Sequence, residues 1–208
     1  MGKAIIEKLI LNNSLPITKI IWASAGDPIS YTFTATQNKT YVAAMVNGDN
    51  ANGYGNSITT TSTDVYYLKD DANGRSLRAY IINLKAGETI SFKISNYSSG
   101  AYRGNNAFLA EVSKKIKPVA QVYYNRATDT TISTTQTLYA NKIYAIIQLS
   151  CGSSRGSSRT INAPNAISAY ASDSIYWGIV CPYDNISVTL TQTGNTAGGP
   201  CLLIYEIK

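Results

Sequence analysis

The chain has 208 residues with 18 basic and 12 acidic side chains, no histidine and a formal net charge of +6. Without histidine, the sequence excludes catalysis by a Ser-His-Asp or Cys-His arrangement, and it excludes histidine as a zinc ligand. Hydrophobic residues make up 44% of the chain and aromatic residues 10%, so the composition excludes a disordered protein. We predict a non-enzymatic protein that holds neither a metal ion nor a cofactor.

Residues 1–15 are predicted to form an N-terminal arm, for which we favour a strand over a short helix. Glu7 and Lys8 interrupt its apolar residues, so it does not fit a signal peptide, and we expect synthesis in the cytoplasm. No stretch approaches the roughly 18 apolar residues that span a membrane, and we expect no membrane insertion. The candidate docking residues of the arm are Lys3, Ile5, Ile6, Leu9 and Leu11.

Residues 16–112 predict a first β-sandwich domain. Ile29–Thr34 and Ile90–Ile94 alternate apolar and polar residues, which is typical of strands buried on one face. Tyr41–Val46, like Tyr144–Leu149 in the second half of the chain, is more continuously apolar, which favours a central strand. Turn dipeptides such as Asn47-Gly48 separate these runs. The pattern predicts about six to eight short strands in a sandwich or jelly roll.

Residues 113–118 form a predicted basic linker with three lysines before Pro118. The linker holds half of the net charge, because residues 1–112 contribute +2 and residues 119–208 contribute +1. Nucleic-acid binding depends on clustered positive charge, which neither flanking region shows. We therefore predict no nucleic-acid partner.

Residues 119–208 are predicted to duplicate the first domain. Asn38–Asn47 matches Asn141–Ser150 at an offset of 103 residues, and Phe108–Val112 matches Leu203–Ile207 at an offset of 95. The matches keep their order, and loop insertions and deletions explain the drift. The predicted fold class is all-β, with two tandem homologous β-sandwich domains, jelly-roll-like, and a short N-terminal arm.

Two pairs of acidic residues recur at matching places in the two domains. We interpret Asp27 and Asp129 as turn residues, and Glu111 and Glu206 as solvent-facing residues of a terminal strand. A glycosidase needs two carboxyl groups about 5–10 Å apart, and no spacing here brings two acids together. Structure is therefore favoured over catalysis for all four.

Two polar loops resemble parts of ligand-binding motifs. Asp70–Gly74 resembles the start of a calcium loop but lacks the later glutamate, so we interpret it as an acidic hairpin tip. Gly152–Arg159 has the glycines, serines and arginines of a phosphate loop but not its strand-loop-helix setting, so we interpret it as a flexible loop.

The chain has an odd number of cysteines, namely Cys151, Cys181 and Cys201. A secreted disulfide framework uses an even number. We interpret these residues as small apolar thiols of a protein made in a reducing cytosol. The sequence leaves a Cys181–Cys201 disulfide open.

Tyrosines are the most informative candidates for binding. Several lie among Gly, Asn and Ser residues outside the alternating runs or close to turns, and tyrosine supplies large contact area at a small entropy cost. Some of them are also suited to closing the ends of a sandwich. The candidate contact surface consists of Tyr54, Tyr97, Tyr102, Tyr170, Trp177 and Tyr183.

The phrase Leu84–Phe92 resembles the turn-then-strand phrase of jelly-roll modules in phage tail and decoration proteins, C1q/TNF-like trimers and carbohydrate-binding modules. The second domain departs from it, with Pro182–Asn185 at that turn. The whole chain resembles phage virion accessory proteins in its duplicated sandwich, low charge and Ser/Thr/Asn/Tyr-rich composition. That resemblance implies assembly on a capsid or tail as a homo-oligomer or lattice, and it names no catalytic residue.

The predicted function is that of a non-enzymatic virion structural protein, either a head decoration or a tail or receptor-binding component. Its expected partners are other virion proteins, further copies of itself and host-surface glycans. The alternative is a carbohydrate-binding or adhesin module on a bacterial cell surface. The sequence leaves open the position on the particle, the ligand, the oligomeric symmetry and the host.

Overall fold

The computed structural model describes residues 18–25, 29–46, 56–70, 77–94, 106–112, 117–126, 132–149, 158–162, 166–171, 175–180, 182, 184–193 and 201–207. The predicted arm, residues 1–15, lies outside these ranges. Every regular element in the described ranges is a β-strand, so the protein is all-β as predicted. No described segment forms a helix that is long and apolar enough to cross a membrane.

The first half of the chain forms a five-stranded sheet in the order β1-β8-β3-β6-β5 and a three-stranded sheet in the order β2-β7-β4. Its strands are β1 (Thr18–Ala25), β2 (Ile29–Thr34), β3 (Lys39–Val46), β4 (Asn56–Thr60), β5 (Val65–Asp70), β6 (Leu77–Leu84), β7 (Thr89–Ile94) and β8 (Asn106–Val112).

The second half forms a five-stranded sheet in the order β13-β14-β11-β16-β9 and a three-stranded sheet in the order β10-β15-β12. Its strands are β9 (Pro118–Arg126), β10 (Ile132–Leu138), β11 (Ile143–Leu149), β12 (Ser158–Asn162), β13 (Ala166–Ala171), β14 (Ile175–Val180), β15 (Ile186–Thr193) and β16 (Cys201–Ile207).

The two halves have the same strand order, with β9 in the place of β1 and β16 in the place of β8. In the first half β1 pairs with β8, β2 with β7 and β3 with β6. In the second half β9 pairs with β16, β10 with β15 and β11 with β14. These antiparallel pairings are nested, as they are when one long hairpin folds over into two sheets. The predicted central strands are confirmed, because β3 and β11 each occupy the middle of a five-stranded sheet.

The three-stranded sheets are buried on one face only. The predicted alternating strand Ile29–Thr34 is confirmed, and along it Ile29 is buried while Ser30, Thr32 and Thr34 are exposed. Hydroxyl groups pair across the exposed face, with 2.9 Å between the side-chain oxygens of Thr32 and Ser91. Thr135 and Thr189 form the corresponding pair of the second half, at 3.0 Å. Such hydroxyl pairs are ordinary cross-strand contacts of a solvated sheet face.

The space between the two sheets of the first half holds one apolar core. It is built from side chains such as Tyr41, Ile82, Phe92 and Leu109, all nearly inaccessible to solvent. Trp22 closes the side of this core, because its ring stacks on that of Tyr31 with the ring centres 4.3 Å apart. Alternation in β3, β6 and β8 then directs every second side chain away from this core.

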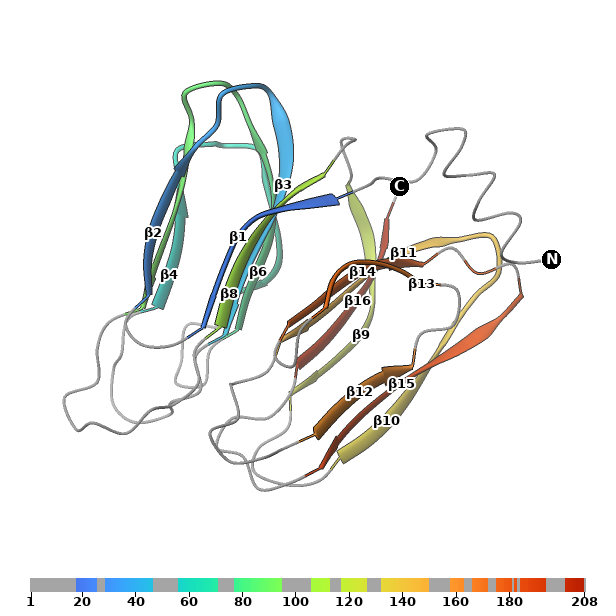
Figure 1. Cartoon of the computed structure of the whole chain (residues 1–208). Helices are drawn as coiled ribbons and strands as arrows, with labels where there is room; N and C mark the ends of the chain where they lie inside the picture. Colours follow the sequence, from blue (N-terminus) through green and yellow to red (C-terminus); the bar gives the residue numbers. More distant parts are fainter. Residues whose placement is uncertain are drawn as a thin grey trace, which may run out of the picture.

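The side chains on the opposite face of the first five-stranded sheet are also fully buried. They are mostly small or β-branched apolar residues with no exposed surface: Val42, Ala44, Ala79, Ile81, Phe108 and Ala110. In Figure 1 this sheet lies against the five-stranded sheet of the second half, and the two three-stranded sheets form the outer layers. The molecule is therefore a four-layered block in which the two large sheets cover each other.

A buried hydrogen bond joins the two halves across this interface. The hydroxyl of Tyr205 in β16 donates to the backbone carbonyl of Leu68 in β5. Tyr205 therefore marks the interface face of β16, and the register places Ala145 of β11 directly beside it. Burial raises the pKa of Tyr205 well above its ordinary value, so this hydroxyl keeps its proton.

The edges of the facing sheets meet in a reciprocal manner. Strand β1 of the first half lies next to β13, and β5 lies next to β9. Strand β9 corresponds to β1, and β13 corresponds to β5. Strand β1 therefore meets the counterpart of β5, and β5 meets the counterpart of β1. A two-fold rotation between identical units produces this exchange of partners, and the two halves follow it approximately.

The Tyr205 hydrogen bond can be tested by the substitution Tyr205→Phe. Loss of the hydroxyl leaves the buried carbonyl of Leu68 without this donor, which is expected to lower the free energy of unfolding by about 1–3 kcal/mol. Denaturant titration of both proteins measures the difference. The control is Tyr67→Phe, the same chemical change at an exposed tyrosine, which should change stability by less than about 0.5 kcal/mol. Equal effects of the two substitutions would contradict the bond between the halves.

Candidate functional site

A polar pocket lies at the end of the first half where β3 begins and β6 ends. Its volume is about 440 Å³, which is in the range of small-molecule sites. We call it the Asn83 pocket. Its described lining residues are Asn38, Lys39, Thr40, Ser62, Thr63, Asp64, Asn83, Leu84, Lys85, Glu88 and Val112.

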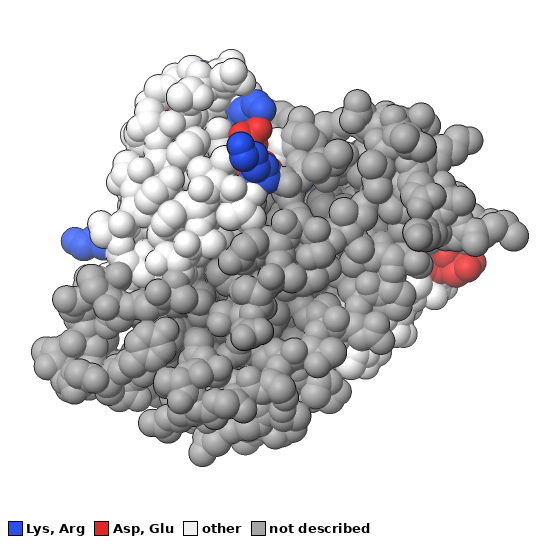
Figure 2. Space-filling view, viewed as in Figure 1, with Lys and Arg blue, Asp and Glu red and all other residues white. Residues whose placement is uncertain are grey.

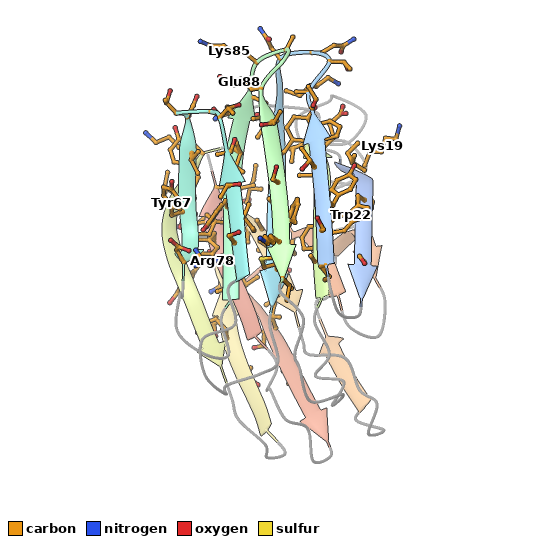
Figure 3. The ribbon with its side chains drawn as sticks, turned by 90° about the vertical axis from the view of Figure 1, so that its left-hand side faces the viewer. Lys19, Trp22, Tyr67, Arg78, Lys85 and Glu88 are labelled. Carbon is orange, nitrogen blue, oxygen red and sulfur yellow. The ribbon has the colours of Figure 1, made fainter. Side chains whose placement is uncertain are left out.

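One wall of the Asn83 pocket is the tight turn between β6 and β7. The carboxylate of Glu88 accepts a hydrogen bond from the backbone N–H of Lys85 at 2.7 Å. Gly87 adopts a φ of 89°, which favours glycine, and its N–H donates to the carbonyl of Ala35. The amide oxygen of Asn38 accepts from the N–H of Ala86. Figure 3 shows Lys85 and Glu88 together at this end of the first half.

A second wall is the segment between β4 and β5. The hydroxyl of Ser62, which is 8% exposed, donates to the backbone carbonyl of Asn83 at 2.7 Å. The same hydroxyl accepts from the N–H of Asp64, and the carbonyl of Asp64 accepts from the N–H of Asn83. Both walls are therefore held in place by hydrogen bonds within the protein.

The Asn83 side chain is only partly satisfied. Its amide oxygen accepts a 2.6 Å hydrogen bond from the hydroxyl of Thr40. Its amide nitrogen is buried, and no hydrogen-bond partner for it exists among the described residues. Buried polar groups are nearly always paired in native proteins, so this inaccessible donor is an exception among the described residues.

An ion pair borders the Asn83 pocket and recurs in the second half. The ammonium of Lys39 lies 2.5 Å from the carboxylate of Glu111, and that of Lys142 lies 2.8 Å from Glu206. The prediction that both glutamates face solvent is only partly right, because each side chain is about a quarter exposed beside its lysine. The hydrogen bond to Glu206 raises the pKa of Lys142. Each carboxylate thus has a lysine partner, which was not predicted from the sequence.

A second polar cluster lies on the edge strand β5. Arg78 forms an ion pair with Asp70, and the hydroxyl of Tyr80 donates to the same carboxylate at 2.6 Å. The ring of Tyr67 packs edge-on against Tyr80 and is 64% exposed. Figure 3 shows Tyr67 and Arg78 at one edge of the first half, opposite Lys19 and Trp22. Asp70, the first residue of the predicted hairpin tip, is the last residue of β5 and pairs with Arg78 of β6, and Asp71–Gly74 lie outside the described residues.

Most of the predicted contact residues cannot be compared with the structure. Tyr54, Tyr97, Tyr102 and Tyr183 and the arm residues Lys3, Ile5, Ile6, Leu9 and Leu11 lie outside the described residues. So do Asp27, Asp129, Cys151 and Cys181, as well as most of the two polar loops.

Two of the predicted contact residues lie in strands. Tyr170 belongs to β13 and Trp177 to β14, and the register pairs them directly with each other. Within these strands, Tyr170 is one residue before the end of β13 and Trp177 is two residues after the start of β14. The exposure of Tyr67 was not predicted, because Tyr67 lies in an apolar strand run and not among Gly, Asn and Ser residues.

Few charged groups appear on the described part of the face that Figure 2 shows. In Figure 2 the blue and red atoms of this face gather mainly at one spot near the upper end of the first half. The linker residue Lys117 places its ammonium 5.9 Å from the ring centre of Tyr66, which is a cation–π contact. Within the described ranges, no group of three or more His, Cys, Asp or Glu residues is arranged to hold a metal ion.

Comparison with known proteins adds no family assignment. No protein-family model, no curated protein and no solved structure matches the chain.

The Tyr80 cluster predicts how stability depends on alkaline pH. Burial and the hydrogen bond to Asp70 raise the pKa of Tyr80 from 10.0 to about 12. Between these values the unfolded chain releases the proton and the native protein retains it, so the free energy of unfolding falls as the pH rises. Denaturant titrations across this pH range should show a smaller fall in the free energy of unfolding for Tyr80→Phe than for the parent protein. Part of the fall should remain, because the pKa of Tyr205 is raised as well. An unchanged slope would contradict the role of Tyr80.

Proposed function

We propose that this chain is a non-enzymatic structural protein of a phage particle, built from two tandem jelly rolls that arose by duplication. The nested pairings β1–β8, β2–β7 and β3–β6 are those of a jelly roll, and they recur as β9–β16, β10–β15 and β11–β14. The recurrent Lys39–Glu111 and Lys142–Glu206 pairs add matched residues to the matched topology. This repetition of one topology in both halves is the observation that carries the proposal.

The proposed mechanism is docking of a rigid block onto neighbouring proteins. The large sheets use their apolar faces on each other, which leaves the outer sheets and the edge strands for contacts. The described outer faces carry hydroxyl pairs such as Thr32–Ser91 and Thr135–Thr189. Tyr67 and Tyr139 are exposed by 64% and 54% and supply larger contact residues, one in each half. These hydroxyl-rich faces carry few charged groups, such as the exposed Lys93 of β7, which suits close packing against another protein surface of low charge.

The proposed partners are other virion proteins and further copies of the chain. Host-surface glycans are a third class of partner, consistent with a receptor-binding component. The protein is proposed to reside on the virion, at the head or the tail. The predicted contact surface and the docking arm remain part of this proposal.

The second candidate is a carbohydrate-binding or adhesin module of a bacterial surface. The Asn83 pocket favours it, because mostly polar residues line a space of about 440 Å³. This candidate needs the pocket and does not need self-assembly.

Self-association provides the test of the virion proposal. Light scattering of the purified chain over a range of concentrations should show a discrete oligomer in addition to the monomer. Tyr67→Ser and Tyr139→Ser remove one exposed tyrosine from each half, and at least one of them should weaken that oligomer. A strict monomer at every concentration would contradict assembly through self-contacts.

A further inference from the structure

The edges of the four sheets are built in two different ways. In the large sheets, the edge strands β1, β5, β9 and β13 each contain a shift of register against their neighbour. Such β-bulges protect a sheet edge from pairing with another chain. In the three-stranded sheets, the edge strands β2, β4, β10 and β12 keep a regular register along their whole length. These edges therefore lack that protection.

Strand β2 shows which groups its free edge presents. The backbone N–H of Ala35, directly after β2, donates to the carbonyl of Glu88, so the backbone groups of Ala35 point to the side of β7. Because these groups alternate in direction along a strand, those of Ser30, Thr32 and Thr34 point away from β7. Among the described strands, only β7 pairs with β2. We call these three residues the β2 edge row, and each of them offers an N–H donor and a carbonyl acceptor.

The edge row is repeated in the second half. At the offset of 103 residues between the two halves, the β2 edge row corresponds to Ser133, Thr135 and Thr137 of β10, which we call the β10 edge row. The two rows are identical in sequence, and all their threonines are exposed. The intervening residues differ, since Tyr31 corresponds to a threonine and Phe33 to a glutamine. The outward row is thus repeated where the residues between its members are not.

Folding alone does not explain this repetition. Exposed positions tolerate substitution with small effects on stability, so two halves with a common origin are expected to diverge there. The opposite edges of the same sheets have diverged, because Asn56 of β4 corresponds to Arg159 of β12. An uncharged, exposed row that is identical in both halves indicates that both edges meet the same kind of partner.

We propose that copies of this chain join through the β2 and β10 edges, by antiparallel pairing of one edge row with an edge row of the next copy. The rows complement each other: with the middle threonines opposite, the serine of each row lies opposite the last threonine of the other. Each such pair exchanges N–H and carbonyl bonds, as in any antiparallel ladder, and Ser–Thr and Thr–Thr are favourable cross-strand pairs. The two three-stranded sheets then form one continuous sheet.

This inference rests on the self-assembly part of the proposed function and names its contact surface. Each copy carries both edges, so pairing can continue beyond a dimer. Tyr139, which is 54% exposed, directly follows β10. One of the exposed tyrosines therefore lies at the end of a proposed joint, where it adds contact area to the backbone bonds.

The first experiment compares the full chain with the double variant Thr32→Pro/Thr135→Pro. Proline removes the outward N–H of each middle threonine but no hydrogen bond within the sheet, so the variant should remain folded. Sedimentation velocity over a range of concentrations should show oligomers for the parent chain and only monomers for the variant. If one proline alone leaves dimers, like edges pair with each other; if it leaves monomers, β2 pairs with β10. Both results support the proposal.

A second set of variants keeps the test valid if proline disturbs the fold. Thr32→Lys/Thr135→Lys places like charges opposite each other in every joint and should also abolish the oligomer. The matched control, Ser91→Lys/Thr189→Lys, adds the same charges to the central strands β7 and β15, which are already paired on both sides. The control should keep the oligomer, and melting temperatures should show that both variants are folded.

Amide hydrogen exchange locates the joint directly. The N–H groups of Thr32 and Thr135 should exchange more slowly at concentrations where the oligomer forms than after dilution to the monomer. The amides of the opposite edge strand β4 should show no such dependence on concentration, because β4 takes no part in the proposed joint.

The outcomes separate this inference from the virion proposal. An oligomer that persists in the folded proline or lysine variants, or that leaves the two threonine amides unprotected, would overturn edge pairing and leave assembly through other surfaces standing. Equal loss of the oligomer in the lysine variant and its control would do the same. A chain that is monomeric at every concentration would contradict edge pairing and self-assembly alike, and would leave these edges to a strand of another protein.

Discussion

The mutual burial of two apolar sheet faces is the interaction on which the rest of this structure depends. A five-stranded sheet with apolar side chains on both faces is not stable in water unless each face is covered. One face of each large sheet packs against the three-stranded sheet of its own half, and the opposite face packs against the large sheet of the other half. Val42, Ala44, Ile81 and Phe108 have no exposed surface as a result. The Tyr205–Leu68 hydrogen bond lies in the same interface, where a hydroxyl without a partner would be costly.

The same constraint determines where a ligand can bind. The large sheets use their apolar faces on each other, so recognition has to occur at the sheet ends, the edge strands or the outer sheets. At one end of the first half the apolar face stops at Thr40 and Asn83, and a pocket is present there. At one edge, the Arg78–Asp70 pair and Tyr80 hold Tyr67 in an exposed position. Both features lie beside the interface, where the sequence no longer has to be apolar.

Much of the fold could be predicted from the sequence, because strand alternation and turn residues are local signals. Ile29–Thr34 was predicted with the bounds that the structure has, and the continuous apolar runs identified β3 and β11 as central strands. Those runs indicated burial of both faces but not what covers the second one, since sheet packing joins residues far apart in the chain.

The pocket escaped prediction for a similar reason. Its residues come from the ends of β3 and β6 and from the segment before β5, which only the folded chain brings together. One signal was present, because the internal alignment sets Thr40 against Ile143 inside otherwise matching apolar runs. The recurrence of Glu111 and Glu206 correctly indicated matching places in the two halves, but the lysine partner of each came only from the structure.

The most direct test of the mutual burial of the two halves is calorimetric unfolding of the intact chain. If each large sheet needs the other half to cover it, the halves cannot unfold separately. The account predicts a single transition whose calorimetric enthalpy equals its van't Hoff enthalpy, as for one cooperative unit. Two resolved transitions, or a calorimetric enthalpy about twice the van't Hoff value as for two independent equal units, would contradict it.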